Sequence, residues 1–174
     1  MIISEAMNAR LNEQVGAEFS AMLQYIAIAA YFDTESLPEL ARHYYTQADE
    51  ERTHAMRFVK FLVDAGAQVE IPSLPEARSQ FPSAEHAVRS ALDGEVKVTQ
   101  QINELVDLAV QERDHISQSM LQWFVTEQLE ELSSSETLLR MVQRAGEAGI
   151  RHVEEYLARR SPSTSTAARS AAEA

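Results

Sequence analysis

Hydrophobic side chains recur at intervals of three and four residues in four separate stretches of the chain, which is the period of an amphipathic α-helix. All five prolines fall outside these apolar seams, where a helix-breaking residue belongs. The expected fold is all-α: a four-helix bundle followed by one short helix. The pattern predicts the four long helices at about residues 4–32, 37–65, 83–110 and 115–145, and the short fifth helix at 149–160.

Capping residues mark the helix starts. The second helix has the clearest signal, because Ser36 is placed to cap the free amides, Pro38 suits a first turn and Glu39 would complete a capping box. Ser83 and Asp114 are weaker start signals for the third and fourth helices.

The lengths of the connections predict the topology. Residues 33–36 and 111–114 are short links, so each joins an antiparallel pair of helices. Residues 66–82 contain three prolines and would reach about 55 Å when extended. Because a helix of this size is about 42 Å long, this link can cross the whole bundle. We therefore expect one long crossover.

Each apolar seam is interrupted near its middle by side chains that bind metals. Glu18 lies in the first seam, Glu51 and His54 in the second, Glu95 in the third and Glu131 in the fourth. The spacing turns all five towards the bundle interior. Singly, each glutamate could lie on a solvated face and His54 could be an ordinary buried histidine. Four seams interrupted at matching heights favour one shared site.

Burial of four carboxylates requires compensation, since each uncompensated charge costs on the order of several kcal/mol. Two divalent cations would balance the four negative charges. An imidazole adds the neutral nitrogen ligand that iron accepts. The sequence therefore predicts a two-metal site.

The composition narrows the possible partners. Asp and Glu number 27 against 15 Lys and Arg, which gives a formal net charge of −12, so we expect neither a nucleic-acid nor an anionic membrane partner. The lack of cysteine excludes disulfides, thiolate zinc sites and iron–sulfur clusters. There is no basic region followed by an apolar one near Met1, and the longest apolar run, residues 25–32, is too short to span a bilayer. We expect a cytoplasmic protein.

The stretches around these ligands resemble a bacterial non-haem ferritin, over about residues 4–160. The resemblance rests on Glu18 with Tyr25, on Glu50-Glu51-Arg52-Thr53-His54, on Glu95, and on Trp123 with Glu127-Gln128-Leu129-Glu130-Glu131. Diiron proteins of the ferritin-like superfamily commonly carry two Glu-x-x-His motifs. This chain has one, and Gln128-x-x-Glu131 replaces the second, as in ferritins.

The resemblance implies a role for each ligand of a dinuclear iron centre. Glu18 and His54 would bind one iron and Glu51 would bridge the two. Glu95 and Glu131 would bind the second iron.

The same resemblance implies further site residues. Gln128 would sit close to the centre, and a third, looser iron site would use Glu50, Glu127 and Glu130. The plain alternative for this acidic run is a solvated helix face.

Two more expectations concern electron donation by Tyr25 and the absence of haem. Tyr25 lies two turns beyond Glu18, and its hydroxyl should lean back to the metal level. The resemblance implies that Tyr25 can supply an electron; an ordinary buried tyrosine bonded to a carboxylate is the alternative. Arg52 and Thr53 stand where haem-binding bacterioferritins have a methionine ligand, so we expect no haem.

The C-terminal part suggests assembly. Gly146 and Gly149 should break the fourth helix, and the apolar face of residues 149–160 needs a partner, for which we expect another subunit. The resemblance implies a hollow shell of twenty-four subunits. Residues 161–174 have the composition of a disordered tail, which could dock into an encapsulin shell.

These features predict an iron storage and detoxification protein with ferroxidase activity. Fe(II) would be oxidised by dioxygen or hydrogen peroxide at the dinuclear site and stored as a ferric mineral. The first alternative is a diiron peroxidase or oxygenase of the same superfamily, although the cysteine-bound iron of rubrerythrin-type enzymes is excluded here. The second alternative is a helical interaction module whose acidic centre binds no metal.

Overall fold

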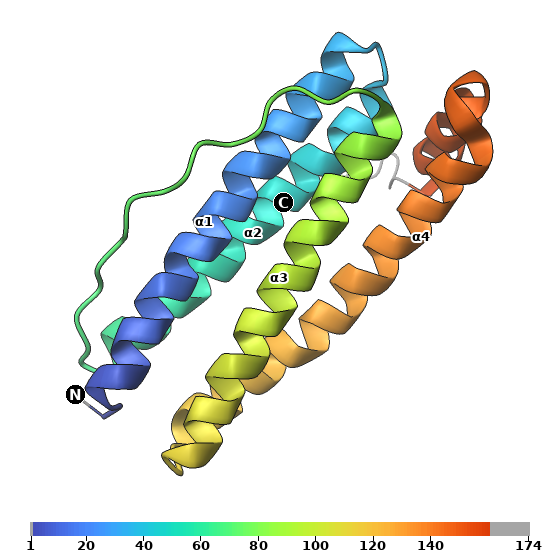
Figure 1. The fold of residues 1–174 in the computed structure, drawn as a ribbon. Helices are drawn as coiled ribbons and strands as arrows, with labels where there is room; N and C mark the ends of the chain where they lie inside the picture. Colours follow the sequence, from blue (N-terminus) through green and yellow to red (C-terminus); the bar gives the residue numbers. More distant parts are fainter. Residues whose placement is uncertain (1, 161–174) are drawn as a thin grey trace, which may run out of the picture.

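Four long helices form an antiparallel bundle in the computed structural model, which describes residues 2–160 (Figure 1). α1 pairs with α2 and α3 with α4, while α1 also borders α3 and α2 borders α4. This arrangement confirms the all-α bundle predicted from the apolar seams. The helices are α1 (Glu5–Thr34), α2 (Pro38–Asp64), α3 (Ala84–Gln111) and α4 (His115–Arg160).

The link between α2 and α3 runs the length of the bundle alongside α1 (Figure 1). Two side-chain amides of α1 hold it there. Asn12 donates to the carbonyl of Gln68 at 2.9 Å and accepts from the N–H of Glu70 at 2.7 Å. Gln24 makes the same pair of bonds farther along the link, each 2.9 Å long. The predicted long crossover is confirmed.

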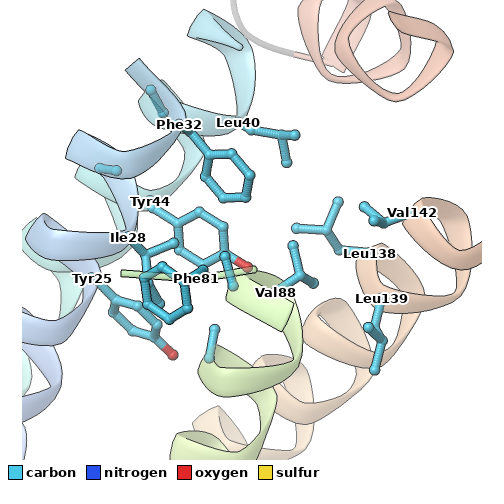
Figure 2. Close-up of a cluster of buried hydrophobic side chains, with 14 of the residues drawn as sticks. Tyr25, Ile28, Phe32, Leu40, Tyr44, Phe81, Val88, Leu138, Leu139 and Val142 are labelled. Atoms are coloured by element: carbon cyan, nitrogen blue, oxygen red, sulfur yellow. The ribbon is translucent and has the colours of Figure 1, made fainter. Parts of the chain in front are cut away.

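The core has two apolar halves with a polar layer between them. Phe32 and Tyr44 stack near the α1–α2 connection and pack in one cluster with Leu138 (Figure 2). Phe58 and Phe124 stack with ring centroids 4.0 Å apart in the other cluster. Along every helix, the predicted ligand residues fall between the members of these two clusters.

α1 is, among the described helices, the one whose length and composition would suit a membrane span. In the structure its apolar residues pack in both halves of the bundle core, and its buried face carries Glu18. The core helix of a bundle passes the same test of length and hydropathy, so the apolarity of α1 is explained by packing.

Two of the three predicted helix caps are confirmed. Ser83 accepts a hydrogen bond from the N–H of His86 at 3.3 Å, and Asp114 accepts one from the N–H of Ser117 at 3.0 Å. The Ser36 cap was wrong. Ser36 has a left-handed backbone with φ of 59°, and Leu37 occupies the cap position without a side-chain hydrogen bond.

The α2 N-terminus is capped instead by Glu154, from the far end of the chain. Its carboxylate accepts from the N–H groups of Glu39 and Leu40 at 2.9 and 2.8 Å. A carboxylate at this position satisfies free amides and complements the positive end of the helix dipole. No local sequence pattern could reveal this long-range cap.

The last part of α4 bends back at Gly146, where φ is 59° (Figure 1). The predicted break at Gly146 is therefore confirmed, whereas Gly149 stays helical. Val153 is buried, and Ile150 and Leu157 pack on the same core cluster. The bend turns part of this apolar face onto its own bundle, and the expectation that another subunit covers the rest stays a prediction.

The predicted disordered tail, residues 161–174, lies outside the described residues. The predicted domain of residues 1–160 stays a prediction, and Met1 is also outside the described residues.

Two helical glycines should respond oppositely to replacement by alanine. A Cβ at Gly16 would lie 2.4 Å from Cγ of Pro72 in the crossover, whereas one at Gly94 meets nothing within 4 Å. Gly16→Ala should lower stability, since overpacking costs about 1–3 kcal/mol and exceeds the helix-propensity gain of about 1 kcal/mol. Gly94→Ala should raise stability by up to about 1 kcal/mol. Thermal unfolding of the metal-free variants measures both, and equal shifts would contradict the packing of the crossover on α1.

Candidate metal centre

α1 and α2 provide the first group of candidate ligands. Glu18 and Glu51 are 1% and 2% exposed, and His54 is 3% exposed. His54 Nδ1 lies 3.4 Å from Glu51 Oε2. One ligand atom from each of the three residues lies within 4.8 Å of the other two. Such a group of two carboxylates and an imidazole can hold one metal ion.

One carboxylate oxygen in this group lacks a hydrogen-bond partner. Gln14 donates to Glu18 Oε1 at 2.9 Å, but Glu18 Oε2 is buried without a hydrogen bond among the described residues. An orphaned carboxylate oxygen is costly to bury. A cation between Glu18, Glu51 and His54 would satisfy it.

α3 and α4 provide the other half of the polar layer. Gln128 donates from Nε2 to Glu95 Oε2 and to Thr99 Oγ1, both at 3.1 Å. The hydroxyl of Tyr25 donates to Glu95 Oε1. Glu131 is buried one turn after Gln128. Tyr25, Glu95, Gln128 and Glu131 are therefore inward. The seams predicted this for Glu95 and Glu131, and the roles of these residues stay predictions.

His54 also faces a second acidic group with its other nitrogen. Nε2 lies 3.8 Å from Glu127 Oε1, and His54, Glu127 and Glu131 have ligand atoms within 4.8 Å of one another. Of the predicted third-site residues, the structure brings Glu127 to the centre. Glu50 and Glu130 are exposed, and Glu50 accepts a hydrogen bond from Gln47.

Three carboxyl groups of the polar layer have pKa values above the ordinary range of a glutamate, namely Glu18, Glu51 and Glu131. Burial raises the pKa of Glu18, and the neighbouring Glu51 raises it further. Burial and then Glu95 raise the pKa of Glu51. Burial, followed by Glu95 and nearby acids, raises the pKa of Glu131 to about 8. The layer therefore needs either protons or cations to be stable at neutral pH.

Sequence reasoning missed two polar neighbours of the ligands, Gln14 and Thr99. Gln14 lies one turn before Glu18, so an i to i+4 pair was a signal that could have found it. Thr99 lies one turn after Glu95 on the seam of α3. Arg57 was also missed: it covers the ring of Trp123 from another helix, and no local pattern predicts that contact.

Comparison with known proteins places this geometry in a family. Residues 8–145 match the family described as Ferritin, the ferritin-like domain. The chain is 43% identical to ferritin BfrB of Mycolicibacterium smegmatis over 152 residues, which cover 87% of this chain and 83% of the relative. It is 33% identical to a bacterial non-heme ferritin of Staphylococcus haemolyticus over 146 residues, covering 84% and 88% of the two chains.

A solved structure shows the same fold. The open pore ferritin of Archaeoglobus fulgidus superposes with a TM-score of 0.88 at 33% identity, covering 91% of this chain and 99% of that one. The chain belongs to the ferritin family, as the motifs around Glu51 and Gln128 implied. The family and fold make iron storage its general function.

The raised pKa of Glu131 predicts how stability of the metal-free protein depends on pH. Below pH 4.5 this carboxyl is protonated in both folded and unfolded chains and has no effect. As pH rises towards about 8, only the unfolded chain releases the proton, so folding stability falls until the folded-state pKa is passed. Thermal midpoints measured across this window should decrease with pH.

Glu131→Gln should make this decrease smaller, because the amide does not ionise. Glu136→Gln, an exposed substitution five positions later on α4, is the matched control and should leave the slope unchanged. An identical slope in wild-type and Glu131→Gln protein would contradict the burial of an ionisable group here.

Proposed function

We propose that this protein is a ferroxidase that oxidises Fe(II) to Fe(III) at a dinuclear site and passes it on for storage as a mineral. Dioxygen or hydrogen peroxide would be the oxidant. The observation that carries the proposal is the buried Glu18, Glu51 and His54 group with its orphaned Glu18 oxygen. Carboxylates are hard ligands that favour Fe(III), and imidazole suits both oxidation states.

Fe(II) is the substrate, and the side chains divide its binding. Glu18 and His54 would hold the first iron from α1 and α2. Glu95 and Glu131 would hold the second from α3 and α4, and Glu51 would lie between them. Gln128 and Tyr25 keep both Glu95 oxygens in place before iron arrives. Two irons held side by side can deliver two electrons to one oxidant molecule.

Protons leave the site as iron enters it. Because the pKa values of Glu18, Glu51 and Glu131 are raised, these carboxyls must release protons before they bind a cation. Binding should therefore weaken as pH falls. Glu127, beside His54, would serve as the next position for iron that leaves the dinuclear site, with Glu50 and Glu130 as its exposed partners.

We further propose that the subunits form a hollow shell of twenty-four copies in the cytoplasm, since a mineral needs an enclosed volume. Docking of the C-terminal tail to an encapsulin shell stays a prediction. Light scattering with and without iron separates storage from the peroxidase or oxygenase alternative. A large particle that retains many irons per chain supports storage, and a small assembly with two irons per chain and turnover of a reductant supports the alternative.

Glu51→Ala and His54→Ala should each abolish rapid Fe(II) oxidation without preventing folding. Loss of Glu51 removes the shared ligand and also relieves repulsion in the metal-free bundle, so its thermal midpoint should not fall by the amount that a core truncation costs. Stopped-flow absorbance of Fe(III) formation measures the rate. Glu136→Ala on the α4 surface is the control and should oxidise iron at the wild-type rate. Fast oxidation by the Glu51→Ala protein would refute the assignment.

A further inference from the structure

Two redox-active aromatic side chains border the candidate metal centre from different halves of the core. Tyr25 belongs to the cluster near the α1–α2 connection, and Figure 2 shows it at the margin of that cluster. Trp123, the single tryptophan of the chain, packs against the other cluster. Their electrostatic surroundings are opposite.

Tyr25 is arranged to lose an electron. Its buried hydroxyl donates to a carboxylate oxygen of Glu95. When a phenol loses one electron it must also lose its proton, and Glu95 is in place to accept it. The proton therefore stays within the Tyr25–Glu95 pair, and only the electron leaves it.

The surroundings of Trp123 disfavour its one-electron oxidation. The guanidinium carbon of Arg57 lies 4.0 Å from the centroid of the indole, over its face. The same indole makes a T-shaped contact with the His54 ring, with centroids 5.5 Å apart and planes at 74°. A cation over the face stabilises the electron-rich neutral indole. One-electron oxidation would place a second positive charge against Arg57, and like charges repel.

We propose that Arg57 is a positioning residue that protects Trp123 from oxidation. Tyr25 then supplies an electron when the bound iron cannot provide both electrons that the oxidant needs. This inference rests on the proposed ferroxidase function. It adds a role for a surface arginine that contacts no candidate ligand.

The electron balance identifies when this protection matters. Reduction of one hydrogen peroxide to two waters takes two electrons and two protons. Two Fe(II) ions supply both electrons. A site holding a single Fe(II) supplies one, and a side chain must supply the other. Tyr25 can give the missing electron while its phenolic proton passes to Glu95, and the two protons that peroxide takes up come from solvent water. Electron loss from Trp123 beside Arg57 is disfavoured.

The test uses peroxide and less than one Fe(II) per subunit, added to the whole assembled protein. Peptide mass spectrometry measures oxygen addition at Trp123, and freeze-quenched electron paramagnetic resonance detects the tyrosyl radical. Arg57→Gln should raise oxidised Trp123 by roughly twofold to fivefold, the factor that corresponds to an exposed cation–π contact. The tyrosyl signal should fall in proportion.

Two further variants separate charge from packing. Arg57→Lys keeps the cation and should protect Trp123 as the wild type does. Arg52→Gln removes a charge from the exposed face of the same helix and should change nothing at Trp123. Equal Trp123 oxidation in wild-type and Arg57→Gln protein would overturn the inference, as would an Arg57→Lys variant that behaves like Arg57→Gln.

Failure of the underlying function gives a different result. If the wild-type protein does not oxidise Fe(II) faster than buffer does, the ferroxidase proposal fails. Normal iron oxidation together with unchanged Trp123 chemistry in Arg57→Gln overturns the role of Arg57 alone.

Discussion

Repulsion among carboxylates buried in one polar layer is the constraint on which the rest of this structure depends. Glu18, Glu51, Glu95 and Glu131 are all nearly excluded from water, and no lysine or arginine forms an ion pair with them among the described residues. Such a layer is stable only when protons or cations neutralise it. The raised pKa of Glu131 and the unbonded oxygen of Glu18 both show that the layer needs a proton or a cation to neutralise it.

The bundle keeps this unfavourable layer in place by packing it between two apolar halves. Stacked aromatic pairs lie in each half, and the crossover is fastened to α1 by Asn12 and Gln24. Glu154 closes the end of the bundle by capping α2. A rigid frame of this kind lets the ligands stay near one another without metal, so that binding need not include the cost of ordering them.

Much of this arrangement could be predicted from the sequence because it follows from periodicity. A three- and four-residue spacing fixes which side of a helix a residue occupies, and so Glu18, Glu95 and Glu131 were correctly placed inside. The length of the link at residues 66–82 was enough to predict the crossover. Ligand roles came from the resemblance to ferritins, and the family assignment was confirmed by comparison.

The contacts that could not be predicted join residues far apart in the chain. Ser36 looks like a cap, but the amides it would serve are taken by Glu154, more than a hundred residues away. Val153 packs on its own bundle because the chain bends at Gly146, and residue spacing does not encode the direction of that bend. Arg57 and Trp123 meet through packing of α2 on α4, which residue spacing does not encode either.

The most direct test of this account is a crystal structure of the protein soaked anaerobically with Fe(II), with anomalous scattering used to locate the metal. The account predicts two iron peaks inside the bundle, one among Glu18, Glu51 and His54 and one among Glu51, Glu95 and Glu131. An interior without anomalous density, or iron bound solely to exposed acids, would contradict it.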